Sequence, residues 1–264
     1  MSKIEIMDSR LAAFEQLLNI MDELREKCPW DKKQTIESLR YLTIEETYEL
    51  SDAILENDLE EVKKELGDLL MHIVFYAKVG SELNAFNIQD IIESISEKLI
   101  HRHPHIYGTV KADSAEAVSQ NWEKIKMGEG RTSVLSGVPK SLPAMIKAHR
   151  IQEKARGVGF DWEEASQVWA KVLEEQQEML DEVNDGTDHR KLEEEFGDYL
   201  FALVNYARFV EVNPEDALEH ANRKFMRRFR FIEDKAKAAG KLIHEMSLEE
   251  MDAYWNQAKV EERL

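Results

Sequence analysis

The feature that most constrains this chain is an acidic helical hairpin, which occurs once in each half of the sequence. The first hairpin carries EETYE followed by ELGD, and the second carries EEQQE followed by EFGD. The acids involved are Glu45, Glu46, Glu49, Glu65 and Asp68 in the first hairpin, and Glu174, Glu175, Glu178, Glu195 and Asp198 in the second. Because two clusters share one spacing, the pattern predicts an internal repeat.

The position of each acid relative to its turn predicts that the two arms bring four carboxylates together. The first turn is expected near residues 57–58, and counted from it Glu49 lies level with Glu65 and Glu46 with Asp68. Equal counts mean equal heights because a helix rises about 1.5 Å per residue, and packed helices lie about 8–10 Å apart. The same count from a turn at Gly186 pairs Glu178 with Glu195 and Glu175 with Asp198.

These acids occupy or border positions where a helix would place apolar residues. Glu46 continues a stripe of Leu39, Leu42 and Ala53 at three- and four-residue spacing, which is typical of a core-facing surface. An unpaired buried carboxylate is costly, and a metal-bound one much less so. An oxygen-only ligand set favours a hard cation, Mg²⁺ or Mn²⁺. A solvated acidic face would suit a chain with 53 acids but not this apolar register.

The composition excludes several classes of function. A net charge of −18 would repel DNA or RNA, so we expect no nucleic-acid polymer as a partner. The single cysteine, Cys28, is typical of a reducing compartment. The most apolar run, LLMHIVFYA, is too short to span a bilayer, and MSKIEIMDSR lacks the pattern of a signal peptide. We therefore expect a cytoplasmic protein that does not interact with membranes.

Helical periodicity and the repeated motifs, with only 5 prolines and 11 glycines, predict an all-α fold of two homologous helical domains. The predicted domains are residues 1–126 and 144–264, and the Gly-, Ser- and Pro-rich residues 127–143 are expected to link them. Asp31 is expected to cap the helix that leads into the first hairpin, and HRHPHIYGT is expected to be a loop. The other expected helices span about residues 11–25, 88–100, 115–126, 144–156, 214–239 and 248–261.

Basic pairs recur in the same order after each hairpin. Lys98 and Arg102 lie four residues apart in the first half, as do Lys224 and Arg228 in the second. Residues four apart share one helix face, so Lys224 and Arg228 are candidates to hold phosphate oxygens that a metal ion leaves uncoordinated.

A Trp–Lys pair also recurs. Trp122 and Lys126 match Trp255 and Lys259, each pair being four residues apart. Trp255 is a candidate to stack on a base while Lys259 reaches a phosphate, and packing in the core is the competing interpretation for the tryptophans.

Together these residues resemble the MazG family of nucleoside triphosphate pyrophosphohydrolases, in its two-domain bacterial form. The family's signature is an EExxE helix followed by ExxD, and both hairpins have it. The segments CPWD at 28–31, RHPHIYG at 102–108, GFDW at 159–162 and KFMRRF at 224–229 also resemble that form, so the resemblance covers nearly the whole chain. It implies an all-α fold in which homodimers assemble helical bundles. It also implies Mg²⁺-dependent hydrolysis of nucleoside triphosphates to monophosphate and pyrophosphate.

The resemblance also implies roles for individual residues. Metal ligands would be Glu175, Glu178, Glu195 and Asp198. Nucleotide contacts would come from Lys171, Glu174, Lys191, Glu194, Lys224, Arg227, Arg228 and Trp255. A second metal site in the first domain would use Glu46, Glu49, Glu65 and Asp68, and the sequence leaves its activity open. Because the basic cluster is richer in the second half, we expect the stronger active site there.

The reaction expected from these residues is in-line attack of water on the α-phosphorus. Glu174 or Glu175 would orient or deprotonate the water, and Lys224 and Arg228 would stabilise the departing pyrophosphate. Two alternatives stay open at this point: a nucleotide-sensing or partner-binding module without turnover, and a hydrolase of guanosine tetraphosphate. A stacking tryptophan discriminates poorly between bases, which is why a broad preference is expected.

Overall fold

The computed structural model describes residues 8–110, 118, 125, 128, 133–186 and 188–262, and these residues form helices and no strands. The prediction of an all-α fold is therefore confirmed. The chain divides into two compact units, Met1–Ala112 and Asp113–Leu264, while the predicted boundaries at residues 126 and 144 stay a prediction. Within the described ranges, no helix has the length and apolar character that crossing a bilayer requires.

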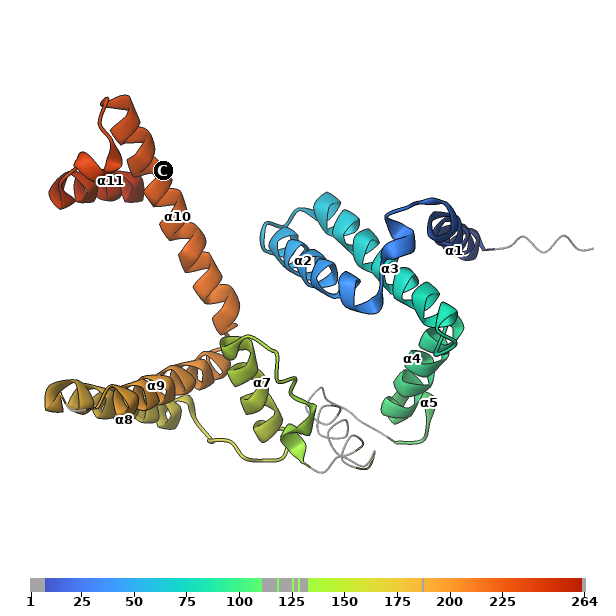
Figure 1. Ribbon diagram of the computed structural model, residues 1–264. Coiled ribbons are helices and arrows are strands. Elements are labelled where there is room, and N and C mark those ends of the chain that lie inside the picture. The colour runs from blue at the N-terminus through green and yellow to red at the C-terminus, as the bar shows by residue number, and fades with distance from the viewer. Residues whose placement is uncertain are drawn as a thin grey trace, which may run out of the picture. The chain divides into compact units, whose positions relative to one another are not determined.

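The first unit is built around a hairpin of two long helices (Figure 1). Helices α2 (Ile36–Leu55) and α3 (Leu59–Glu82) pair with each other, and α1 (Ser9–Lys27) packs against α3. The core that joins these three helices centres on Met21, Leu39 and Phe75. The remaining elements of the unit are the short 3₁₀ turn η1 (Asp31–Lys33), α4 (Ile88–Arg102) and the single turn α5 (Pro104–Tyr107).

Local sequence signals explain the ends of the first hairpin. Thr35, not Asp31, caps α2, through a capping box with Ser38, so the prediction of a cap at Asp31 is wrong. Asp58 accepts hydrogen bonds from the backbone N–H groups of the first turn of α3, which fixes the reversal near the predicted place. The prediction that HRHPHIYGT is a loop is also wrong in part: Pro104 starts the helical turn α5, where its missing N–H is harmless.

The second unit repeats the hairpin with α8 (Ala165–Asp185) and α9 (His189–Phe209) (Figure 1). Gly186 ends α8 with a φ of 64°, a left-handed conformation that glycine adopts without strain. Helix α7 (Ala144–Arg156) packs on α9, and the 3₁₀ turn η2 (Val134–Gly137) packs on α7. Further along, α10 (Pro214–Ala238) contacts η3 (Ile243–Glu245) and α11 (Leu248–Glu261).

The helices outside the hairpins follow the predicted spans closely, because their apolar periodicity and their caps agree. The expected spans 144–156 and 248–261 are those observed, and the others differ by one or two residues at an end. Most of the helix expected over 115–126, including Trp122 and Lys126, lies outside the residues that the structure describes.

Candidate functional site

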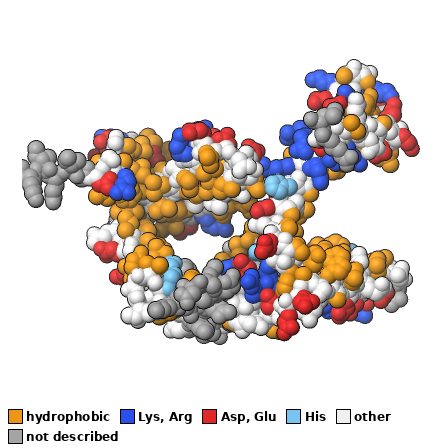
Figure 2. Space-filling model, turned by 180° about the vertical axis from the view of Figure 1, so that it is seen from behind, with side chains coloured by type: hydrophobic (Ala, Val, Ile, Leu, Met, Phe, Trp, Pro, Cys, Tyr) orange, Lys and Arg blue, Asp and Glu red, His pale blue; other side chains and the backbone are white. Residues whose placement is uncertain are grey.

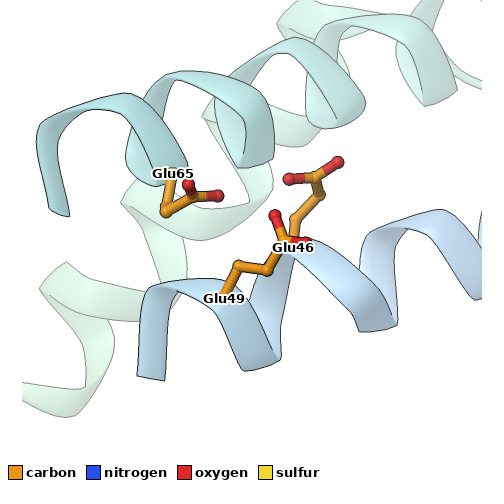
Figure 3. A group of neighbouring side chains, drawn as sticks. All are labelled: Glu46, Glu49 and Glu65. Carbon is orange, nitrogen blue, oxygen red and sulfur yellow. The ribbon is translucent and has the colours of Figure 1, made fainter. Parts of the chain in front are cut away.

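The first hairpin brings three of its four predicted metal ligands to one point. Glu46 and Glu49 on α2 face Glu65 on α3 (Figure 3). One carboxylate oxygen from each of the three lies within 4.8 Å of the others. Asp68, the fourth predicted ligand, is outside this group but close enough that its negative charge raises the pKa of Glu46.

The electrostatics of this first acidic cluster (Glu46, Glu49, Glu65) favour a bound cation. Glu65 is only 6% exposed, and its Oε2 is buried without a hydrogen-bond partner among the described residues. Burial, followed by the charges of Glu49 and Glu46, raises the pKa of Glu65, and burial followed by Asp68 raises that of Glu46. A buried ionised carboxylate without a hydrogen-bond donor is stabilised by a positive partner, and Glu65 is the residue of this cluster to which that applies.

The second hairpin forms an equivalent cluster. Glu175 on α8 and Glu195 and Asp198 on α9 each place a carboxylate oxygen within 4.8 Å of the other two; these three residues are the second acidic cluster. Burial raises the pKa of Glu195, and the largest charge contribution comes from Glu178, ahead of Asp198. Glu178 therefore acts on the cluster through its field, although it is not one of the three residues that meet.

Lys171 holds one edge of the second cluster. Its Nζ lies 2.7 Å from Oε1 of Glu174 and 2.7 Å from Oε1 of Glu175. Hydrogen bonds to Glu174, followed by those to Glu175, raise the pKa of Lys171, which keeps the ammonium group charged. Two more predicted nucleotide contacts, Lys191 and Glu194, are exposed on α9 near the cluster, and Glu194 pairs with Arg190 at 3.2 Å.

The remaining predicted nucleotide contacts lie on α10 and α11. Within one chain, the two arginines among them form hydrogen bonds at the end of α11. Arg227 and Arg228 both donate to Glu262, at 2.8 Å and 2.7 Å, while Lys224 is exposed. The guanidinium of Arg228 also lies 5.4 Å from the ring centre of Trp255. The hydrogen bonds and ion pairs of these described residues do not join them to the second acidic cluster.

Trp255 and Lys259 also contact residues close to them in the fold. Trp255 packs against a small core of Ile232, Ala236 and Met246, which agrees with the packing interpretation of this residue. Lys259 Nζ donates to Asn256 at 3.2 Å, one turn earlier on α11.

Sequence reasoning missed a cavity beside the second acidic cluster. It has a volume of about 390 Å³ and lies between α7, α8 and α9, where Glu175 and Asp198 form part of its lining. Its polar groups include Gln152 and Asn205, neither of which belongs to an acidic or basic motif. The sequence signal that could have revealed the cavity is that the two halves of the chain differ at the positions of Gln152 and Asn205.

Comparison with known proteins identifies the family. A family model described as the MazG nucleotide pyrophosphohydrolase domain matches residues 34–107 and 163–230, one hairpin in each match. The chain is 45% identical over 251 residues to the nucleoside triphosphate pyrophosphohydrolase/pyrophosphatase MazG of Thermotoga maritima, covering 93% of this chain and 95% of that protein.

Two further relatives extend the likeness. Identity is 43% over 256 residues to the nucleoside triphosphate pyrophosphohydrolase of Escherichia coli K12, covering 94% of this chain and 97% of that protein. It is 48% over 255 residues to the protein YabN of Bacillus subtilis, covering 95% of this chain and 52% of that protein. With both hairpins matched and identity extending over nearly its whole length, the chain belongs to the MazG nucleotide pyrophosphohydrolase family and contains its domain twice.

Proposed function

We propose that this chain hydrolyses nucleoside triphosphates to nucleoside monophosphates and pyrophosphate in a reaction that requires Mg²⁺. The observation that carries the proposal is the second acidic cluster, in which Glu175, Glu195 and Asp198 meet within 4.8 Å on a family-matched hairpin. The names of the relatives from Thermotoga maritima and Escherichia coli support the same reaction.

The donor set of both clusters fits a hard divalent cation. All the donors are carboxylate oxygens, which suit Mg²⁺ and, as a second candidate, Mn²⁺. The unpartnered buried oxygen of Glu65 is the kind of group that a cation would satisfy. The proposed ligands are Glu175, Glu178, Glu195 and Asp198, with a second site at Glu46, Glu49, Glu65 and Asp68. When bound, the cation would neutralise negative charge that develops on the phosphate oxygens.

The chain's own residues supply the proton acceptor for the attacking water. Lys171 fixes the carboxylates of Glu174 and Glu175 by its two ion pairs, and either carboxylate can accept the proton. The water oxygen forms the new bond to the α-phosphorus, and the bond between that phosphorus and the bridging oxygen breaks. Pyrophosphate then leaves with the electron pair of the broken bond.

The basic residues of α10 would stabilise the leaving group from a second copy of the chain. Lys224 and Arg228, with nucleotide contacts from Lys191, Glu194, Arg227, Trp255 and Lys259, complete the proposed site. Within one chain the hydrogen bonds of Arg227 and Arg228 lead to Glu262 and not to the second acidic cluster. We therefore propose that a homodimer brings α10 of one copy to the acidic hairpin of the other.

Exposed apolar side chains on the hairpins support a homodimer. Hydrophobic residues cover much of the visible surface of both units (Figure 2). On α8 and α9 the exposed ones include Leu173, Leu180, Val183, Phe196 and Leu200, which are 42–52% exposed in one chain. In a folded protein, a large exposed apolar surface of this kind is typical of a protein–protein interface.

The proposed function is tested by pyrophosphate release from a panel of ribo- and deoxynucleoside triphosphates and guanosine tetraphosphate, with Mg²⁺, with Mn²⁺ and without metal. We expect release from triphosphates with either cation and none without. Glu178→Ala and Asp198→Ala should abolish it in the full-length chain. Glu193→Gln is the matched control, because this exposed acid of α9 lies outside the cluster. Tight triphosphate binding without product would show a binding module, and wild-type rates in both alanine variants would refute the second-unit assignment.

A further inference from the structure

The cavity beside the second acidic cluster has the dimensions and lining of a small-molecule site. Its volume of about 390 Å³ is within the range of about 300–1,000 Å³ that is common for such sites. The apolar part of the wall comes from Ile151, Phe160, Trp162, Val168, Phe201 and Ala202. Since Glu175 and Asp198 also line the cavity, a ligand inside it lies next to the proposed metal ligands.

Gln152 lines this cavity and carries a buried hydrogen-bond acceptor without a partner among the described residues. Its Nε2 donates to the carbonyl oxygen of Phe201 at 2.8 Å, which determines the orientation of the amide. Its Oε1 is buried and has no partner among the residues that the structure describes, and the residue as a whole is 7% exposed. A buried acceptor is costly to leave without a donor, so this oxygen is suited to an N–H group of a ligand.

Asn205 offers the complementary donor on the adjoining turn of α9. Its Oδ1 accepts from Nε and Nη2 of Arg208, at 3.2 Å and 2.9 Å, so its NH₂ group is the end that can donate to a ligand. Phe201 and Asn205 are four residues apart and share one face of α9. Because Gln152 and Asn205 both line the cavity, their amides offer one acceptor and one donor, the combination that the hydrogen-bonding edge of a nucleobase requires.

An ion pair anchors the segment that carries two aromatic lining residues. Arg208 donates to both carboxylate oxygens of Asp161, at 2.8 Å and 2.5 Å, and both side chains are largely buried. This pair ties the segment GFDW to α9 and so keeps Phe160 and Trp162 at the cavity. The pair thus positions the backbone that carries both rings, and Trp162, which is 42% exposed, is accessible for stacking on a base.

The equivalent place in the first unit is filled. The offset of 130 residues that relates Glu65 to Glu195 also relates Phe75 to Asn205. Phe75 is 1% exposed and packs in the core with Met21 and Leu39. A large aromatic side chain thus occupies the position that a small amide occupies beside the cavity.

We propose that the cavity of the second unit takes the base of the nucleoside triphosphate, with Gln152 and Asn205 reading its edge and Trp162 against its face. This inference rests on the proposed function, because it assumes that the phosphates lie at Glu175 and Asp198. Gln152 is then a specificity-determining residue. In the first unit, Phe75 fills the position equivalent to that of Asn205, so this unit can hold a cation but not a base.

The test compares variants of the cavity in the full-length chain. Gln152→Leu keeps the size of the side chain and removes its acceptor. We expect the KM of triphosphates to rise about tenfold, the effect of one lost hydrogen bond, and the differences in kcat/KM between bases to narrow. Ala155→Leu narrows the cavity and should raise KM for every base, whereas Ala170→Leu, on an exposed position of α8, should not. Inhibition by inorganic tripolyphosphate, which has no base, should be unchanged in all three.

The outcomes separate this inference from the proposed function. Unchanged KM values in folded Gln152→Leu and Ala155→Leu, with a raised KM in Trp255→Ala, would overturn the inference and place the base at Trp255. If the wild-type chain hydrolyses no triphosphate, adenosine binding followed by tryptophan fluorescence still tests the cavity. We expect quenching that Trp162→Phe and Gln152→Leu both weaken, and quenching that persists in both variants would refute the site. Thermal melting of each variant checks that it folds.

Discussion

Replacing Asp198 with asparagine should weaken the stabilisation of the second unit by divalent cations, while the first unit keeps its full response. Asp198 is one of three acids whose oxygens lie within 4.8 Å of one another, and asparagine keeps its size but removes its charge. Burial, Glu178 and Asp198 together raise the pKa of Glu195. Without metal, the substitution should therefore stabilise the unit slightly, since it removes one of the mutually repelling charges.

The effect of a cation can be estimated from mass action. At a Mg²⁺ concentration about 100 times its Kd, binding stabilises the folded unit by about 2.7 kcal/mol. For a domain of about 150 residues this corresponds to a rise in Tm of roughly 5–10 °C. If the loss of one ligand weakens binding by about 10- to 100-fold, the stabilisation falls to between about 1.4 and 0.4 kcal/mol. The Tm shift of the second unit should fall to about half or less.

Calorimetric melting with and without Mg²⁺ measures the shift, and Mn²⁺ titration measures the number and affinity of the sites. We expect two tight sites per chain in the wild type, and in Asp198→Asn one tight site and one weakened by about 10- to 100-fold. Glu193→Gln removes the same charge from an exposed position of α9 outside the cluster and should keep both the shift and the count. A full Mg²⁺ shift and two sites of wild-type affinity in Asp198→Asn would refute the assignment of this cluster as a cation site.

Three further predictions concern packing, pH and assembly. Leu39→Ala should destabilise the first unit by about 2–5 kcal/mol in urea unfolding, because Leu39 is fully buried; Leu11→Ala, at an exposed position, is the control, and equal losses would contradict the core assignment. Hydrogen bonds from Arg228 and Arg227 lower the pKa of Glu262, so the stability that Glu262 contributes is present above its unfolded pKa of about 4.3 and is lost as pH falls through the lower folded value. Thermal melting from about pH 3 to about pH 7 should therefore show a smaller acid-induced loss of stability for Glu262→Gln than for the wild type. Identical pH profiles would exclude the effect. Light scattering should find a dimer that Leu180→Lys weakens, and a wild-type monomer would rule out the proposed assembly.

The hairpins were predictable because their determinants are local. The period of the apolar residues and the rise of a helix determine which acids face inward and at what height. Glu46, Glu49 and Glu65 meet as those counts require. Asp68 and Glu178 lie outside the two groups of three, because equal height leaves the direction of each side chain to packing between the helices.

The roles of the basic residues depend on contacts that sequence order does not contain. Lys224 and Arg228 share a helix face as their spacing predicts, yet Arg228 donates to Glu262 and lies over Trp255. Trp255 belongs to α11 and Glu262 is the residue that ends it, and nothing in the spacing within α10 specifies how α11 packs against it.

The sequence by itself determined the all-α class, the duplicated hairpin and the acids that face each other, since these follow from periodicity along one helix. Only the tertiary structure decided that the second unit has a cavity beside its acids and that Phe75 fills the equivalent place in the first. Asn205 and Phe75 satisfy the same periodicity. The volume that each leaves depends on side chains from other helices, which meet only when the chain has folded.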